Sequence, residues 1–385
     1  MKTDKPFIIM ASLMRLEGAT GVQTHMREFA SYLAQQGVAH AVATPFQGPL
    51  LPLLYAFIAL RRVLEYVWKP GAVWLYRNGH AFLLRQYLRQ LMREHGRCVV
   101  YAQCPLSSSV ALDCVTGPAQ KVVQVIHFNG SQADEWIGKG MIARGGPIDQ
   151  GIRKLESAVM SRVDGLVYVS LFMQDELRKT MPGLGKVRSA VIPNFVAPLG
   201  AEVMRPDLAG RDLVAIGTLE PRKNQSFLLK VLGEASRRGH KLTLTLVGDG
   251  PDRVALERLA DEQGVRAQVN FEGFHPRGRL FIPGHKLCVH AAQMENLPLV
   301  LIEALSAGVP VVAARVGGIG EIFREGVEGR FWPLDDVGKA CDVLLAVLCD
   351  RDALSRMSDA AATRFREHFE SSTVASRLLQ FLMAS

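Results

Sequence analysis

The chain lacks several of the patterns that would assign it to a specialised class of protein. Its 385 residues include only six cysteines, and none forms a Cys-x-x-Cys pair or a zinc-like spacing with histidine. We therefore expect buried free thiols in a reducing compartment, not a disulfide framework. No apolar run reaches the ~18 uninterrupted residues of a membrane-spanning helix. The sequence also contains no low-complexity tract and no repeat of fixed period.

The N-terminus begins with a hydrophilic stretch, residues 1–5, which is followed by a short apolar run from Pro6 to Leu13. This run is too short for the apolar core of a signal peptide with its cleavage site, and it fits a first buried strand better. We therefore expect a cytoplasmic protein.

Basic charge is concentrated in the first half of the chain. Residues 1–195 contain 22 Lys and Arg against 13 Asp and Glu, whereas residues 196–385 contain 23 against 24. The first half alone is therefore expected to meet an anionic partner. We do not expect that partner to be a nucleic acid, because the basic excess comes without a DNA- or RNA-binding motif.

Short apolar runs alternate with helical patterns along most of the chain. Runs that are continuously apolar are typical of parallel strands covered on both faces. The runs interpreted as strands are Pro6–Ser12, Val38–Pro45, Ala72–Tyr76, Cys98–Gln103, Lys121–His127, Gly165–Ser170, Asp212–Gly217, Leu242–Gly248, Val269–Phe274, Leu287–Ala292 and Val309–Ala314. Helices are expected at about Val22–Gln36, Asn224–Arg238, Asp252–Glu262, Pro298–Ala307 and Asp335–Cys349, and from Asp352 to the end.

The segment Val191–Pro206 interrupts this alternation. It contains three prolines and no helical period, so we interpret it as a linker between domains. The predicted fold class is α/β, with two doubly wound Rossmann-like domains at 1–195 and 196–365. The C-terminal helix, 366–385, is a candidate to cross back to the first domain. Ligands of such folds bind at the carboxyl ends of strands, so a cleft between facing domains is the expected site.

Two carboxylates, Glu295 and Glu303, flank the start of a predicted helix. Asn296 is a candidate cap for this helix, and Pro298 suits its first turn. Eight residues of helix would separate the carboxylates by about 12 Å, which is too far for them to share a proton. This spacing suits an elongated ligand with a phosphate bound between its ends by free helix N–H groups. The alternative is a capping carboxylate and an exposed helical Glu.

The Glu-x7-Glu pair, followed by Glu303–Ala313 (EALSAGVPVVA), resembles the donor-site motif of glycosyltransferase family 4, which comprises retaining enzymes of the GT-B fold. The resemblance is specific over about 210–335 and weaker in the first domain, where residues 47–96 match nothing nameable. Other segments that resemble the family are Val214–Asn224, Leu246–Pro251, Val269–Phe274, Val316–Gly329, Glu17–Val38 and Ile192–Asn194.

The resemblance implies a role for each matched position. Glu303 would bind the ribose hydroxyls of the nucleotide, and Glu295 the donor sugar. Lys223 would neutralise the diphosphate, with Arg222 supplying the second positive charge because Thr218 stands where the family usually has Arg. His127 resembles the family's histidine near the sugar. The remaining predicted substrate-binding residues are Gly21, Gly248, Asn296, Leu297, Pro298 and Leu299.

These roles predict a transferase that moves a hexosyl unit from a nucleotide sugar, with UDP preferred over GDP. The acceptor would be a glycan, or one linked to a polyprenyl diphosphate, in the synthesis of bacterial surface polysaccharide or lipopolysaccharide. The first domain would bind the acceptor and the second the donor. No metal or other cofactor is expected. The alternatives are a nucleotide-sugar epimerase of similar fold and a catalytically silent sugar-nucleotide-binding subunit.

The segment Gly48–Lys69 combines apolar residues with Arg61, Arg62 and Lys69. Further along, Arg85, Arg89 and Arg93 recur at helical spacing. An apolar wedge beside a cationic stripe would suit peripheral contact with the inner face of the cytoplasmic membrane. A buried helix with a solvated charged face is the alternative.

Overall fold

The computed structural model describes residues 6–18, 20–48, 50–199, 208 and 210–384. It divides into two compact units. Unit 1 contains the chain up to Ile192 together with Ala375–Ser385, and unit 2 contains Pro193–Val374. Part of the interpreted linker, residues 200–206, lies outside the described residues. The last eleven residues of the chain thus belong to the same unit as its first half.

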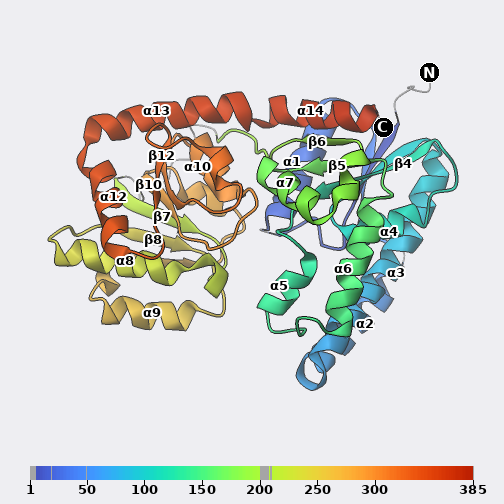
Figure 1. The fold of residues 1–385 in the computed structure, drawn as a ribbon, viewed down its shortest axis with the longest axis horizontal. Coiled ribbons are helices and arrows are strands. Elements are labelled where there is room, and N and C mark those ends of the chain that lie inside the picture. Colours follow the sequence, from blue (N-terminus) through green and yellow to red (C-terminus); the bar gives the residue numbers. More distant parts are fainter. Residues whose placement is uncertain (1–5, 19, 49, 200–207, 209, 385) are drawn as a thin grey trace. The chain divides into compact units, whose positions relative to one another are not determined.

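Unit 1 is built on a six-stranded sheet with the order β2-β1-β3-β4-β5-β6, in which every pair of neighbours is parallel (Figure 1). Its strands are β1 (Phe7–Ala11), β2 (His40–Ala43), β3 (Cys98–Ala102), β4 (Gln120–Ile126), β5 (Gly165–Tyr168) and β6 (Ser189–Val191). Its helices are α1 (Gly21–Gln35), α2 (Leu51–Val67), α3 (Lys69–His95), α4 (Pro105–Leu112), α5 (Gln132–Gly138), α6 (Pro147–Met160) and α7 (Leu171–Thr180).

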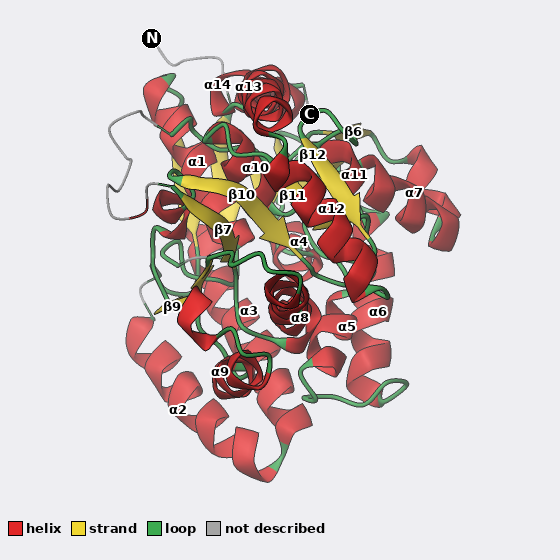
Figure 2. Cartoon of the chain, turned by 90° about the vertical axis from the view of Figure 1, so that its left-hand side faces the viewer, coloured by secondary structure: helices red, strands yellow, loops and turns green. Residues whose placement is uncertain are grey.

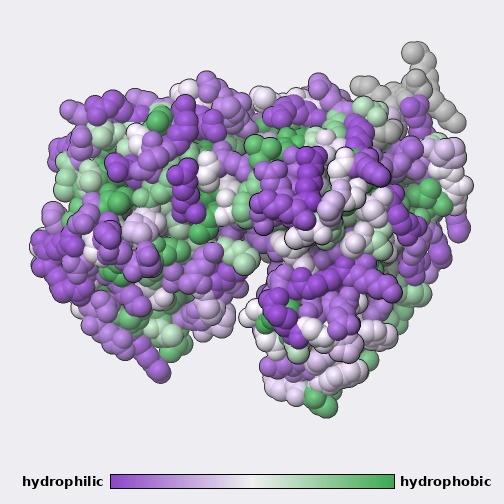
Figure 3. All heavy atoms as spheres, viewed as in Figure 1, coloured by the Kyte–Doolittle hydropathy of each residue, from purple (hydrophilic) through white to green (hydrophobic). Residues whose placement is uncertain are grey.

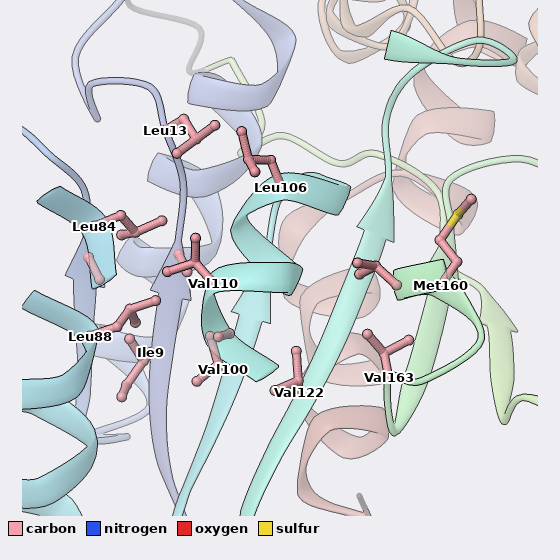
Figure 4. Packing of buried hydrophobic residues seen from close by; sticks show 14 of the residues in the cluster. Ile9, Leu13, Leu84, Leu88, Val100, Leu106, Val110, Val122, Met160 and Val163 are labelled. Carbon is pink, nitrogen blue, oxygen red and sulfur yellow. The ribbon is translucent and has the colours of Figure 1, made fainter. Parts of the chain in front are cut away.

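The core of unit 1 lies where the central strands meet the helices. Figure 4 shows Ile9, Val100 and Val122 of β1, β3 and β4 beside Leu88 of α3 and Val110 of α4. All of these side chains are almost completely buried. Burial on both faces explains why these strands read as continuous apolar runs and not as alternating ones.

Unit 2 repeats the plan with a second parallel sheet of the order β12-β11-β10-β7-β8-β9, and Figure 2 shows several of its strands side by side. Its strands are β7 (Arg211–Ile216), β8 (Leu244–Val247), β9 (Val269–Gly273), β10 (His285–His290), β11 (Val311–Ala314) and β12 (Gly329–Trp332). Its helices are α8 (Gln225–Arg237), α9 (Arg253–Glu262), α10 (Leu299–Ser306), α11 (Ile319–Ile322), α12 (Val337–Cys349) and α13 (Arg351–His368), followed by α14 (Ser371–Met383), which enters unit 1. The predicted class, two doubly wound Rossmann-like domains, is confirmed.

Three details of the predicted elements are wrong. Ala72–Tyr76 is not a strand but lies inside α3, because a short apolar run does not distinguish a strand from a buried helical segment. The C-terminal helix is interrupted at Phe369 and Glu370, where Glu370 forms a bridge with Val196. Finally, Asn296 does not cap α10, whose N-cap is Pro298 and which has no side-chain cap.

Candidate functional site in unit 2

The carboxyl ends of β7 and β8 are held together by close backbone contacts. Gly217, which follows β7, donates its N–H to the carbonyl of Val247 at 3.0 Å. Gly248 has φ +145, and a Cβ there would lie 1.9 Å from the carbonyl oxygen of Gly217. No residue with a side chain fits that approach, so the two loops can meet only through glycine. Gly248 therefore shapes the loop that leads to Lys223.

The loop after β7 leads through a short 3-10 turn, Pro221–Lys223, into α8. Asn224 joins the two with φ +54, in the left-handed region that asparagine tolerates better than most residues. Thr218 is exposed, and its carbonyl accepts a hydrogen bond from Gln225 Nε2 at 2.9 Å. This turn carries Arg222 and Lys223 past the end of the strand.

Lys223 meets Glu295 at this edge of the sheet. Its Nζ donates to Glu295 Oε1 at 2.5 Å, and His290 Nε2 lies 3.2 Å from the same oxygen. Glu295 is only 7% exposed, and His290 only 6%. The indole of Trp332 donates to the carbonyl of His290, which fixes the end of β10. A buried carboxylate thus lies between a cationic and a titratable side chain.

The ionisation of Glu295 is set by this pairing. Burial acts to raise its pKa, but the charge of Lys223 and the hydrogen bonds from His290 and Lys223 outweigh burial, and they lower the pKa from 4.5 to about 2. Glu295 is therefore ionised at neutral pH. An ionised carboxylate accepts hydrogen bonds, as contact with sugar hydroxyls would require.

Arg222 lies at the exposed rim of this cluster. Its guanidinium donates to Glu220 Oε1 at 2.8 Å and to the carbonyl of Met294 at 3.2 Å, and it lies 3.8 Å from Glu295. Its own carbonyl accepts from the N–H of Gln293 at 3.0 Å. These contacts tie the turn before α8 to the loop before α10. Two adjacent cations therefore stand at the same edge of the sheet.

The loop before α10 is fixed through its backbone. The carbonyl of Asn296 accepts from the N–H of Gly318, and that of Leu297 accepts from Asn194 Nδ2 at 2.8 Å. Gly317 has φ +55, and a Cβ there would lie 1.7 Å from the carbonyl oxygen of Glu295. The Val316–Gly329 segment, singled out in the sequence, thus packs directly on the Glu295 loop.

The helix α10 begins at Leu299, directly after Pro298, both of which are buried. The N-cap residue Pro298 gives the first N–H groups of the helix no side-chain cap, and N–H groups at a helix start favour an anionic ligand. Glu303 lies in the following turn and is partly exposed. It contributes, after burial, to the raised pKa of Cys288 on β10, which places its carboxylate near that strand.

The predicted residues of unit 1 form a separate group. His127 follows β4 directly, and its Nε2 lies 3.2 Å from Gln103 Oε1. Its ring lies 4.8 Å from that of His25, whose Nε2 lies 3.0 Å from the hydroxyl of Tyr101. Burial lowers the pKa of His25 to about 4, and burial together with His25 lowers that of His127 well below its usual value. Both imidazoles are therefore neutral at neutral pH.

Gly21 is the first residue of α1, whose N-cap, Thr20, forms a reciprocal capping box with Gln23. The Gln23 side chain also donates to the carbonyls of Arg15 and Glu17, at 3.0 and 2.7 Å. These bonds fix the glycine-bearing loop against the start of α1. Gly21 therefore lies at a capped helix start.

Sequence reasoning missed His290, to which it gave no role, and the neighbours of His127. His290 ends β10, next to β7, whose following loop carries Lys223. The sequence placed His290 within a predicted strand, Leu287–Ala292, but only the sheet order shows that this strand lies next to β7. His25, by contrast, lies inside α1, and nothing in its local sequence distinguishes it from a core residue.

Comparison with known families covers nearly the whole chain. The model described as "Glycosyltransferase Family 4" matches residues 19–198, and that described as "Glycosyl transferases group 1" matches 205–364. A glycogen synthase of Mycobacterium tuberculosis is 28% identical over 247 residues, which are 62% of this chain and 59% of that protein. A GDP-mannose-dependent phosphatidylinositol monomannoside mannosyltransferase of Mycolicibacterium smegmatis is 31% identical over 44% of this chain and 47% of its own length.

This chain thus spans about three fifths or less of the length of these relatives. Solved structures match it more completely. A sucrose-phosphate synthase of Thermosynechococcus elongatus superposes with a TM-score of 0.75 over 98% of both chains, at 17% identity. Anabaena HepE in complex with UDP-glucose gives 0.70 over 98% of this chain and all of its own, at 16% identity. These neighbours share the predicted GT-B fold, and the chain belongs to glycosyltransferase family 4.

Proposed function

We propose that this protein transfers a hexosyl unit, with retention of configuration, from a nucleotide sugar to a glycan or lipid-linked glycan. The observation that carries the proposal is the cluster of Lys223, Arg222 and Glu295 beside the start of α10. Two cations and a row of backbone N–H groups are the groups that a departing diphosphate needs. An ionised carboxylate next to them suits a sugar.

The proposal assigns a separate role to each charged side chain of the site. Lys223 and Arg222 neutralise the charge that develops on the leaving phosphate. Glu295 accepts hydrogen bonds from the donor sugar, and Glu303 binds the ribose. No protein nucleophile is required if the acceptor attacks from the face that the diphosphate leaves, with the phosphate taking the acceptor's proton.

The donor base, the acceptor and the cellular place are the finer parts of the proposal. We favour a UDP sugar, because the structural neighbour HepE was solved in complex with UDP and glucose and with UDP-glucose; a GDP sugar is the alternative. The acceptor is proposed to be a polyprenyl-diphosphate-linked glycan of bacterial surface polysaccharide or lipopolysaccharide. The reaction would take place in the cytoplasm, at the inner face of the membrane, through contact with the basic first half of the chain.

Binding and slow donor hydrolysis test the proposal without knowledge of the acceptor. A thermal-shift panel of UDP, GDP, UDP-glucose, UDP-N-acetylglucosamine and GDP-mannose should identify one nucleotide that stabilises the protein, because a ligand of the native state raises its stability by mass action. The selected nucleotide sugar should then release its nucleoside diphosphate slowly in water. Release should be unchanged by EDTA, since protein cations neutralise the phosphate.

The variant Lys223→Ala should lower this release by about a hundredfold or more at saturating donor, by analogy with the loss of one group that stabilises developing charge. Lys286→Ala is the control, because Lys286 pairs with Asp212 on the surface at 2.7 Å. Near-normal turnover in Lys223→Ala would refute the charge-neutralising role. Conversion of the donor to an epimer without release of nucleotide would favour the alternative of a nucleotide-sugar epimerase. Donor binding without any release of nucleotide would favour the catalytically silent binding subunit.

A further inference from the structure

The helix α2 exposes an apolar face to solvent. Of its seventeen residues only Leu54 is buried, and the helix packs chiefly against α3, where Phe57 fills the space beside Gly79. The exposed large apolar residues are Leu53, Tyr55, Leu60, Val63, Tyr66 and Val67, and we call them the α2 face. At 100° per residue they fall within about one half of the helix circumference.

The most exposed part of the α2 face lies near the C-terminal end of the helix. Tyr66 is 94% exposed and Val67 is 79% exposed, followed by Trp68 at 59%. Trp74 of α3 is a further exposed indole, at 57%. Figure 3 shows hydrophobic residues at the tip and along the margin of the hairpin that α2 and α3 form. Contiguous exposed apolar surface of this kind marks an interaction site.

The charges of α2 and of the residue that follows its C-terminal Trp68 are mostly positive. Residues 51–69 contain three Lys and Arg and one acidic residue, Glu65. Glu65 is already paired with Arg61 at 2.8 Å, whereas Arg62 and Lys69 are exposed. The partner of this surface should therefore combine negative charge with an apolar layer.

An anionic membrane surface has both properties, with its negative headgroups lying above the apolar acyl chains. Apolar residues enter the boundary of the acyl chains, cations remain among the headgroups, and Trp and Tyr prefer the level between them. In the described part of the chain, no helix combines the length and the apolarity needed to cross a bilayer. If α2 contacts a bilayer, it therefore lies in the plane of the membrane surface.

A second copy of the chain fits the α2 face less well. A symmetric dimer would bring Arg62 and Lys69 of one copy near those of the other. Glu65 is the one acidic residue between Leu51 and Lys69, and it is already paired with Arg61. Like charges brought together in this way oppose association.

We propose that the α2 face docks on anionic phospholipid, with α2 lying along the membrane surface. This inference deepens the proposed function. It rests on that function for its purpose, since docking would bring the protein to its lipid-linked acceptor. The docking itself needs neither donor nor acceptor, so it can fail while the transferase proposal stands.

Vesicle flotation of the full chain tests the proposal. The protein should float with phosphatidylcholine vesicles that contain about 30% phosphatidylglycerol, and it should be released by high salt, which screens the headgroup charge. It should not float with phosphatidylcholine alone. The emission of exposed Trp68 and Trp74 should shift to shorter wavelength on binding, because the indoles leave water. Failure to float with either vesicle at low salt would overturn the proposal.

Two sets of variants separate the apolar and the charged contributions. The triple variant Val63→Gln, Tyr66→Gln, Val67→Gln should lower vesicle affinity by at least about tenfold, because it removes the inserted apolar groups. Arg62→Gln with Lys69→Gln should lower it by about fivefold for each charge. Matched controls in unit 2 are Val254→Gln, at a residue 58% exposed on α9, and Lys230→Gln with Arg258→Gln.

Circular dichroism and release of nucleoside diphosphate from the donor should be unchanged in the triple variant, which shows that it folds. Equal vesicle affinity of the triple variant and the wild type would overturn the proposal. So would light scattering that shows a dimer in the wild type and a monomer in the triple variant, since the α2 face would then be a protein interface.

Discussion

Replacement of Lys223 by Met should destabilise unit 2 in a way that depends on pH. In the wild type the pKa of Glu295 is lowered from 4.5 to about 2. A shift of that size corresponds to about 3 kcal/mol of stabilisation at neutral pH. Because the folded pKa lies below the unfolded one, this stabilisation is complete above the unfolded value and is lost as the pH falls from about 4.5 towards about 2.

Without Lys223, burial becomes the dominant influence on Glu295 and should raise its pKa above the unfolded value. The variant then carries a buried carboxylate without its main partner, which costs about 3–5 kcal/mol at neutral pH. This cost should shrink as the pH falls and Glu295 takes up a proton. The free-energy difference between wild type and Lys223→Met should therefore be larger at pH 8 than at pH 5.

Urea unfolding at the two pH values measures this difference. Trp332 reports on unit 2, since it is buried there against Phe227. Its fluorescence is best followed after the other three tryptophans, Trp68, Trp74 and Trp136, have been replaced by Phe.

The control for this measurement is Lys286→Met, which breaks the ion pair with Asp212, where the lysine side chain is 46% exposed. An exposed pair of this kind contributes up to about 1 kcal/mol. An equally small loss in Lys223→Met, or a loss that does not change with pH, would refute the electrostatic account of Glu295.

The sequence predicted the fold well because both sheets are parallel and covered. Strands such as β3 and β4 are buried on both faces and therefore read as continuous apolar runs. The same rule failed for Ala72–Tyr76, whose apolar residues are buried in a helix, α3. The short strands β6 and β12 were not named, because strands of three and four residues leave little pattern to read.

The candidate site was only partly predictable. Lys223 and Glu295 are 72 positions apart in sequence, and only the resemblance to a family linked them. Their direct contact depends on the neighbouring positions of β7 and β10 in the sheet, a fact of topology that no local pattern contains. The helix start near Pro298 was anticipated, but Asn296 as its cap was not correct, because the helix begins at Leu299 and its N-cap position is Pro298, two residues after Asn296.

Two further changes probe the loops around Glu295. Gly317→Ala should lower the free energy of unfolding by several kcal/mol, because its Cβ would lie 1.7 Å from the carbonyl oxygen of Glu295. The control Gly264→Ala, at a residue with φ +68 and open space around it, should lower it by only about 1 kcal/mol in urea unfolding. Equal losses would show that the loop at Gly317 adapts easily. Arg222→Ala should lower donor hydrolysis, and adding Thr218→Arg should restore much of it, because Thr218 is exposed at the same strand end. A guanidinium delivered from either side of the turn supplies the same charge, so rescue is expected if the role of Arg222 is electrostatic. Absence of rescue would mean that Arg222 acts instead by holding the Met294 carbonyl in place.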